Sequence, residues 1–111
     1  MGDLEDIRSE LREFARDRDW FQYHDPKNLA MAVASEAGEL LAELRWLSTE
    51  DSQVGKISTE RREAIRLEMA DILIFLVRMA DVLELDLIDA VRDKIAINEG
   101  RFELSDESPQ L

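Results

Sequence analysis

The sequence contains no cysteine, which excludes a disulfide framework and any metal site built from thiolates. It has only two prolines and four glycines, too few for a loop-rich fold or for linkers between domains. No segment alternates polar and apolar residues with period two, so β-strands are not expected. The longest apolar run, ILIFLV at 72–77, is far shorter than the roughly 20 residues of a membrane-spanning helix. The polar start MGDLEDIRSE lacks the apolar region of a signal peptide, so we expect a soluble, cytoplasmic protein.

Basic residues are also scarce, with 14 Lys and Arg against 26 Asp and Glu, and the net charge is −12. Such a charge repels phosphate backbones and anionic lipids, which excludes nucleic acid polymers and membranes as general partners. A small phosphate compound that arrives with metal ions stays compatible, because the cations change the local charge. The 45% hydrophobic content is too high for a disordered chain, and 111 residues favour one domain.

Hydrophobic periodicity predicts an all-α protein with four helices, at about 3–18, 26–46, 58–83 and 86–100. Asp25 followed by Pro26 is a strong helix start, with an N-cap acceptor before a proline at the first helical position. Asp86 can cap the last helix in the same way. We expect a four-helix bundle in one domain over 1–102, followed by a polar tail over 103–111.

The third predicted helix is apolar on nearly every side, which is unusual for a surface helix. Three other short helices are not expected to cover it. We therefore predict a homo-oligomer, a dimer or a tetramer, assembled through this helix. The alternative is a central helix wrapped entirely inside one subunit.

Four carboxylates interrupt the apolar stripes of the second and third helices. Glu36 and Glu39 are three residues apart on one helix, and Glu68 and Asp71 are three apart on the next, so each pair shares a face. Burying unpaired carboxylates costs several kcal/mol each or forces them to protonate. A divalent cation is the simplest compensation, and oxygen-only ligands favour Mg²⁺ or Mn²⁺ over Zn²⁺. Ordinary surface charges or interfacial salt bridges are the alternative for either pair alone.

The same spacing resembles the signature of the MazG-like all-α nucleoside triphosphate pyrophosphohydrolases: Glu-x-x-Glu at 36–39, then Glu-x-x-Asp at 68–71. The stretches RDWFQYHDPKNLA, SEAGELLAELRW, EMADILIFLVRMA and AVRDKIAINEGRF look most like the deoxycytidine-triphosphatase branch. The resemblance covers about residues 10–102. It departs from the pattern at Ser35, where many members have an acid, and at Phe75 and Phe102, where relatives often have tyrosine.

The resemblance implies a Mg²⁺-dependent hydrolysis of a nucleoside triphosphate, such as dCTP or a modified dNTP, to the monophosphate and pyrophosphate, as house-cleaning of the nucleotide pool. It implies that Glu36, Glu39, Glu68 and Asp71 are the metal ligands. Of these, Glu36 or Glu39 could also orient or deprotonate the attacking water.

Further residues match the substrate contacts of the family. Lys94, Asn98 and Arg101 match residues that contact the triphosphate, although a basic residue near a helix end also suits the helix dipole. His24 and Asn28 match the region that packs on base and sugar; without the resemblance, His24 would be read as a loop or capping residue. Trp46 and Phe75 could stack on the base or simply pack in the core.

Other functions stay open. Within the same class, the protein could act on dUTP or on phosphoribosyl-ATP. From another class comes a non-enzymatic helical oligomerisation or regulatory module, which would explain the apolar third helix but not the four acids beside it.

Overall fold

The computed structural model describes residues 2–102, and the predicted tail at 103–111 lies outside them. Four α-helices make up most of this part: α1 (Asp3–Asp17), α2 (Pro26–Leu44), α3 (Thr59–Val82) and α4 (Leu87–Arg101). Short 3-10 turns at Phe21–Tyr23 and Val54–Lys56 lie in the two longer connections. The described residues contain no strand, so the all-α class and the four helices are confirmed.

The helix starts follow the capping residues of the sequence. The side chain of Asp25 accepts a hydrogen bond from the Asn28 N–H at 2.8 Å, and Pro26 takes the first helical position, as predicted. The side chains of Ser58 and Asp86 cap α3 and α4 in the same way. Helix α2 ends at Leu44, two residues earlier than expected, so Trp46 lies in the turn beyond it.

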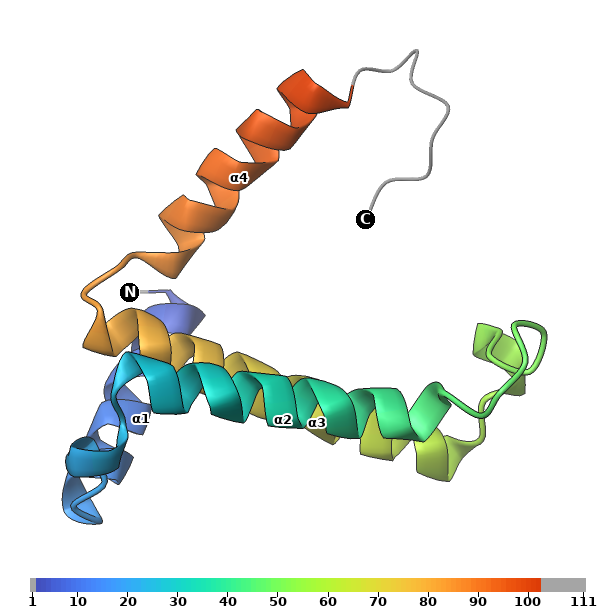
Figure 1. Ribbon diagram of the computed structural model, residues 1–111, viewed down its shortest axis with the longest axis horizontal. Coiled ribbons are helices and arrows are strands. Elements are labelled where there is room, and N and C mark those ends of the chain that lie inside the picture. Colours follow the sequence, from blue (N-terminus) through green and yellow to red (C-terminus); the bar gives the residue numbers. More distant parts are fainter. Residues whose placement is uncertain (1, 103–111) are drawn as a thin grey trace.

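Helices α2 and α3 lie side by side as a long antiparallel hairpin, and α1 packs across one end of it (Figure 1). The few buried apolar side chains among the described residues come from these three helices: Ala15, Leu29, Val77 and Ala80. Hydrophobic burial in the single chain is therefore concentrated at the end of the hairpin that α1 covers.

A cluster of charged side chains ties α1 to α3 beside this core. The Asp81 carboxylate, whose side chain is 7% exposed, accepts from Arg12 Nε at 3.0 Å and from Arg78 Nη1 at 2.9 Å. Arg8 also contacts this carboxylate, with its Nη1 3.5 Å from Asp81 Oδ1. The guanidinium groups lower the pKa of Asp81, chiefly through the Arg12 hydrogen bond. We call Arg8, Arg12, Arg78 and Asp81 the arginine cluster.

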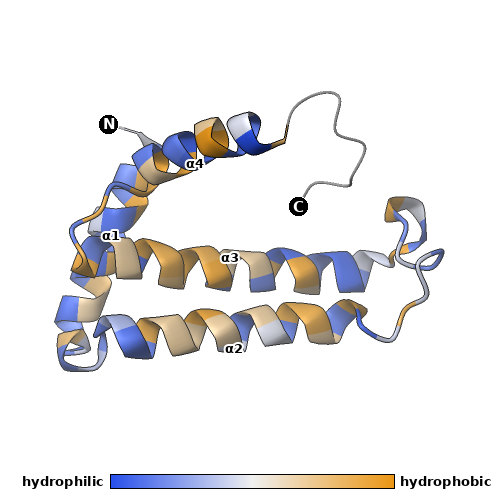
Figure 2. Cartoon of the chain, turned by 45° about the horizontal axis from the view of Figure 1, so that its top comes forward, coloured by the Kyte–Doolittle hydropathy of each residue, from blue (hydrophilic) through white to orange (hydrophobic). Residues whose placement is uncertain are grey.

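Helix α4 extends away from the hairpin rather than packing along it (Figures 1 and 2). The turn before it is tight, because Glu84 has a left-handed backbone (φ 57°) and the Leu85 N–H donates to the Ala80 carbonyl at 2.8 Å. Its apolar residues Ile88, Val91 and Ile95 recur at helical spacing, and each is between 44% and 51% exposed. Within one chain, the four helices thus do not close around a common core.

None of the helices in the described part of the chain combines the length and the hydropathy required to cross a membrane.

Candidate active site

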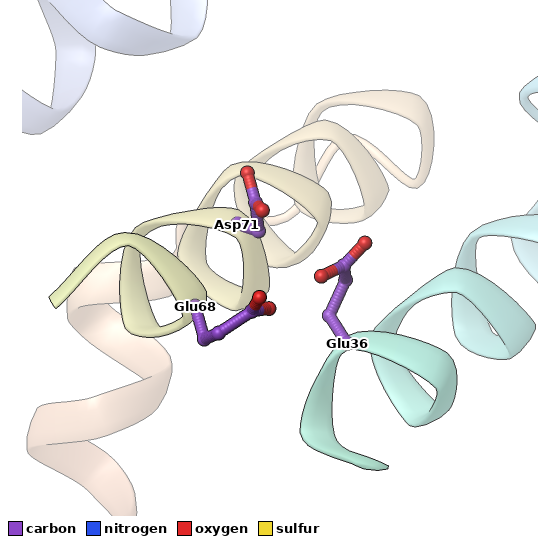
Figure 3. Close-up of side chains that lie close together, drawn as sticks. All are labelled: Glu36, Glu68 and Asp71. Atoms are coloured by element: carbon purple, nitrogen blue, oxygen red, sulfur yellow. The ribbon is translucent and has the colours of Figure 1, made fainter. Parts of the chain in front are cut away.

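The α2–α3 hairpin brings acids from both helices together. Glu36 extends from α2 towards Glu68 and Asp71 on α3 (Figure 3). One carboxylate oxygen from each of the three lies within 4.8 Å of the others, close enough for a single ion to contact all three. The antiparallel pairing produces this meeting, because it places the middle of α2 opposite the middle of α3.

Glu39, the fourth predicted ligand, is not part of this group of three. It lies one turn further along α2 and is exposed, although its negative charge still contributes to the field at Glu68. The structure therefore brings together three of the four predicted ligands and places the fourth at the edge of the group.

The three carboxylates have no cation to neutralise them among the ion pairs of the described residues. Glu68 Oε2 is shielded from solvent and has no hydrogen-bond partner in the described part of the chain. Burial raises the pKa of Glu68, and the facing Glu36 carboxyl and the charges of Asp71 and Glu39 raise it further. An unpartnered buried oxygen among like charges is the environment that a bound cation would relieve.

The donor set also indicates which ion would fit. All the candidate ligand atoms are carboxylate oxygens, and hard cations such as Mg²⁺ prefer oxygen. The described part of the chain offers three or four protein ligands here, which suits an ion that keeps several water molecules or shares substrate phosphates. The residues present therefore fit Mg²⁺ or Mn²⁺ on chemical grounds.

His24 and Asn28 lie at the start of α2, near the end of the hairpin that α1 covers. His24 Nδ1 accepts a hydrogen bond from Arg78 Nε at 3.2 Å, and the Trp20 ring lies 6.0 Å from the imidazole. The Asn28 side-chain amide donates to the Tyr23 carbonyl at 3.1 Å and to Asp25 Oδ2 at 3.0 Å. Asn28 therefore has a structural role in this chain in addition to the predicted substrate contact.

The two candidate aromatic walls differ in their surroundings. Trp46 is 85% exposed, with the Arg45 guanidinium 5.4 Å from its ring centre. Phe75 is half-buried on α3, one turn beyond Asp71. Plain core packing thus does not account for Trp46 in the single chain, whereas Phe75 is partly covered.

Lys94, Asn98 and Arg101 share one face of α4, as their spacing predicts. Because α4 extends away from the hairpin, the single chain does not bring them to the carboxylates (Figure 1). Their meeting with the acids would require either a movement of α4 or a second subunit.

The arginine cluster was not predicted as part of any site. The sequence indicates this cluster only through Arg78 and Asp81, two charged residues three apart at the end of an otherwise apolar run. A buried ion pair is the usual reason for charges in such a position. The contact of Arg78 with His24, however, depends on the fold, because 54 residues separate the two.

Known proteins resemble this chain over most of its length. dCTP pyrophosphatase 1 of Bos taurus is 41% identical over 99 residues, and the human protein of the same name is 40% identical. These matches cover 89% of this chain but 59% and 58% of the two relatives, so the chain spans less than two thirds of their length. The crystal structure of a pyrophosphatase from Archaeoglobus fulgidus superimposes with a TM-score of 0.84 at 35% identity, covering 92% of this chain and 94% of that one. No protein-family model matches the chain.

Proposed function

We propose a function from the family to which this chain belongs, the MazG-like all-α nucleoside triphosphate pyrophosphohydrolases. The protein hydrolyses a deoxynucleoside triphosphate, dCTP or a related or modified dNTP, to the monophosphate and pyrophosphate. The observation that carries the proposal is the group of three facing carboxylates with an unpartnered buried oxygen on Glu68. The name of the cattle and human relatives supports dCTP as the first substrate to test.

Glu36, Glu68 and Asp71 would hold Mg²⁺ in this proposal, and Glu39, at the edge of the group, is the fourth candidate ligand. The ion, when bound, supplies positive charge that neutralises the triphosphate and the departing pyrophosphate. One carboxylate of α2, Glu36 or Glu39, would also orient the attacking water and accept its proton.

The reaction itself is a substitution at the α-phosphorus. The oxygen of water forms the new bond to this phosphorus, and the bond to the oxygen that bridges to the β-phosphate breaks. The water proton passes to the orienting carboxylate, and pyrophosphate leaves with the bridging oxygen. Lys94, Asn98 and Arg101 donate to the phosphates, which suits their charge and hydrogen-bonding groups.

The nucleoside end of the substrate contacts His24, Asn28, Trp46 and Phe75 in this proposal. Aromatic faces suit stacking on any base, so Trp46 and Phe75 contribute affinity rather than base selection. Phenylalanine at position 75 offers no hydroxyl, so it cannot hydrogen-bond the nucleoside.

A homo-oligomer completes the site. The exposed apolar residues Ile88, Val91 and Ile95 adjoin the face of α4 that carries Lys94, Asn98 and Arg101, because successive residues are rotated by about 100°. A second copy that covers the apolar face would therefore lie beside the phosphate-binding residues. Exposed patches of this kind mark subunit interfaces.

The direct test is pyrophosphate release from a panel of standard and modified dNTPs with Mg²⁺, with dUTP and phosphoribosyl-ATP included. We expect one substrate to be strongly preferred and the activity to disappear without the metal. Glu39→Gln and Asp71→Asn should each abolish turnover, whereas Glu13→Gln on the exposed face of α1 should not. If no member of the panel released pyrophosphate, the proposal would be wrong.

A non-enzymatic oligomerisation module is the second candidate, and the exposed apolar face of α4 favours it equally. The two differ in their response to Mg²⁺. A metal site that exists only in the folded protein raises the melting temperature specifically with Mg²⁺, whereas a plain scaffold does not respond in this way.

A further inference from the structure

Arg78 is the most deeply buried charged side chain among the described residues, with 3% of its surface exposed. Its Nη1 donates to Asp81 at 2.9 Å, and its guanidinium lies 5.4 Å from the centre of the Phe21 ring. Its Nε donates to His24 Nδ1 at 3.2 Å. The ion pair with Asp81 accounts for the burial of the charge, but it does not account for the contact with His24.

This contact restricts the state of the imidazole. A guanidinium nitrogen only donates, so His24 Nδ1 has to present its lone pair. The ring proton of neutral His24 therefore resides on Nε2, and protonation of Nδ1 would place two donors against each other. The orientation of the ring and the position of its proton are thus both set by Arg78.

Burial and the positive charge beside His24 also favour the uncharged imidazole. Arg12, Arg78 and Asp81 line a cavity of about 290 Å³ together with His24, Phe21 and Val82. Asp81 is already paired with three arginines and is not available to stabilise an imidazolium. Burial lowers the pKa of His24, and the positive charge of Arg78 lowers it further. At neutral pH, His24 is therefore an uncharged donor through Nε2.

The position of His24 indicates which part of a substrate it would meet. Pro26 begins α2 and Glu36 lies ten residues later, so about 15 Å of helix separates His24 from the carboxylates. If the carboxylates hold the triphosphate, His24 is at the distance of the nucleoside end. An uncharged N–H donor suits a carbonyl or ring-nitrogen acceptor of a base.

We propose that Arg78 is a positioning residue that holds His24 as the neutral Nε2–H tautomer, so that Nε2 donates to an acceptor on the nucleobase of the substrate. This inference rests on the proposed function for the identity of the ligand. The arrangement of Arg78 and His24 itself does not depend on that function.

The test begins with nitrogen NMR of the imidazole, which is unambiguous because the chain contains one histidine. In the wild-type protein without ligand, we expect Nε2 to be protonated and Nδ1 to be unprotonated at neutral pH, with titration below the ordinary range of histidine. Arg78→Lys keeps a charge beside Asp81 but loses the Nε donor, so His24 should become a mixture of tautomers. Arg78→Met should also move the titration of His24 upwards. Arg66→Lys, which changes an exposed pair with Glu63 on the same helix, is the matched control and should leave the His24 spectrum unchanged.

Kinetics then test the contact with substrate. For the nucleotide that the wild type hydrolyses, His24→Phe and Arg78→Lys should each raise KM roughly threefold to tenfold with little change in kcat, as expected for one neutral hydrogen bond. An Nδ1–H tautomer in the wild type would overturn the proposal even if no variant folded. A His24 spectrum unchanged in folded Arg78→Lys, or a loss of kcat with unchanged KM, would overturn it as well. Absence of turnover in the wild type would instead overturn the proposed function, while the spectrum would still decide whether Arg78 sets the tautomer.

Discussion

Glu68→Gln should separate the stability of the fold from the binding of metal. Glu68 has a buried, unpartnered oxygen and faces Glu36 and Asp71, so its charge is unfavourable in the metal-free protein. The amide keeps the shape of the side chain and removes the charge. We therefore expect the metal-free variant to melt above the metal-free wild type. We also expect it to respond much less to Mg²⁺, because one charged ligand is missing.

The size of the metal response follows from linkage. At a Mg²⁺ concentration of about ten times Kd, binding to the folded state adds about 1.4 kcal/mol. For a domain of this size, that raises Tm by about 5 °C. Removing a residue that supports a metal site commonly weakens binding about tenfold. In that case the stabilisation by Mg²⁺ falls to about 0.4 kcal/mol, and Tm rises by less than about 2 °C.

The assay is thermal unfolding at one fixed protein concentration, with and without Mg²⁺, because oligomers melt in a concentration-dependent way. Glu13→Gln on α1 is the control for loss of one negative charge, and NaCl at the same ionic strength is the control for non-specific screening. An equal Mg²⁺ shift in Glu68→Gln and wild type would refute the assignment of Glu68 as a ligand. A metal-free variant that melts below the wild type would refute the reasoning about the unfavourable charge.

The pH dependence provides an independent check on Glu68. The pKa of Glu68 in the folded protein is raised above the ordinary value of 4.5. Between pH 4.5 and this raised pKa, the folded state therefore binds more protons than the unfolded state. In this window, the contribution of Glu68 to stability falls as pH rises. The Mg²⁺ response should change in the opposite sense, since protonation of Glu68 competes with the metal. Glu68→Gln should flatten both dependences.

Three further predictions concern the rest of the fold. Asp81→Asn should destabilise the protein by about 3 kcal/mol, measured by urea unfolding at pH 7, because it leaves the charges of buried Arg78 and of its neighbour Arg12 without their carboxylate partner. The wild type should lose the same stabilisation as pH falls below about 3.8, the ordinary pKa of the carboxyl. If Asp81→Asn and the wild type were equally stable at pH 7, the burial argument would be wrong. Glu84→Gly should stabilise by about 0.5–1 kcal/mol, seen as a higher Tm, because glycine adopts the left-handed backbone without strain. Ile95→Asp should reduce the mass measured by light scattering and abolish turnover, whereas an unchanged mass would show that α4 does not form the interface.

Much of the fold could be predicted because local signals agree with it. The 3.6-residue period located the helices, and Asp25 and Asp86 are N-caps in the structure. The end of α2 was less certain, because nothing between Leu44 and Trp46 forces a helix to stop. The short 3-10 turns at Phe21–Tyr23 and Val54–Lys56 also escaped prediction, since runs of three residues leave no periodic pattern.

The site could be predicted in part. Glu36, Glu68 and Asp71 meet as expected, because the apolar faces that carry them pack against each other when the two helices pair. The exposure of Glu39 did not follow from its spacing, since the crossing of two helices decides which turn lies at the contact. The positions of Lys94, Asn98 and Arg101 relative to the acids also depend on the direction of α4.

The sequence by itself determined the four helices, their caps and the placement of two acid pairs on apolar faces, because these depend on neighbours within a few residues. Only the tertiary structure decided that three carboxylates come within 4.8 Å of one another, that Arg78 contacts His24, and that α4 leaves its apolar face exposed. These features join residues that are distant in the chain, and the packing of helices sets such distances. The acids meet because α2 and α3 pack as an antiparallel pair, and that packing brings together charges that local pattern alone could only place on separate helices.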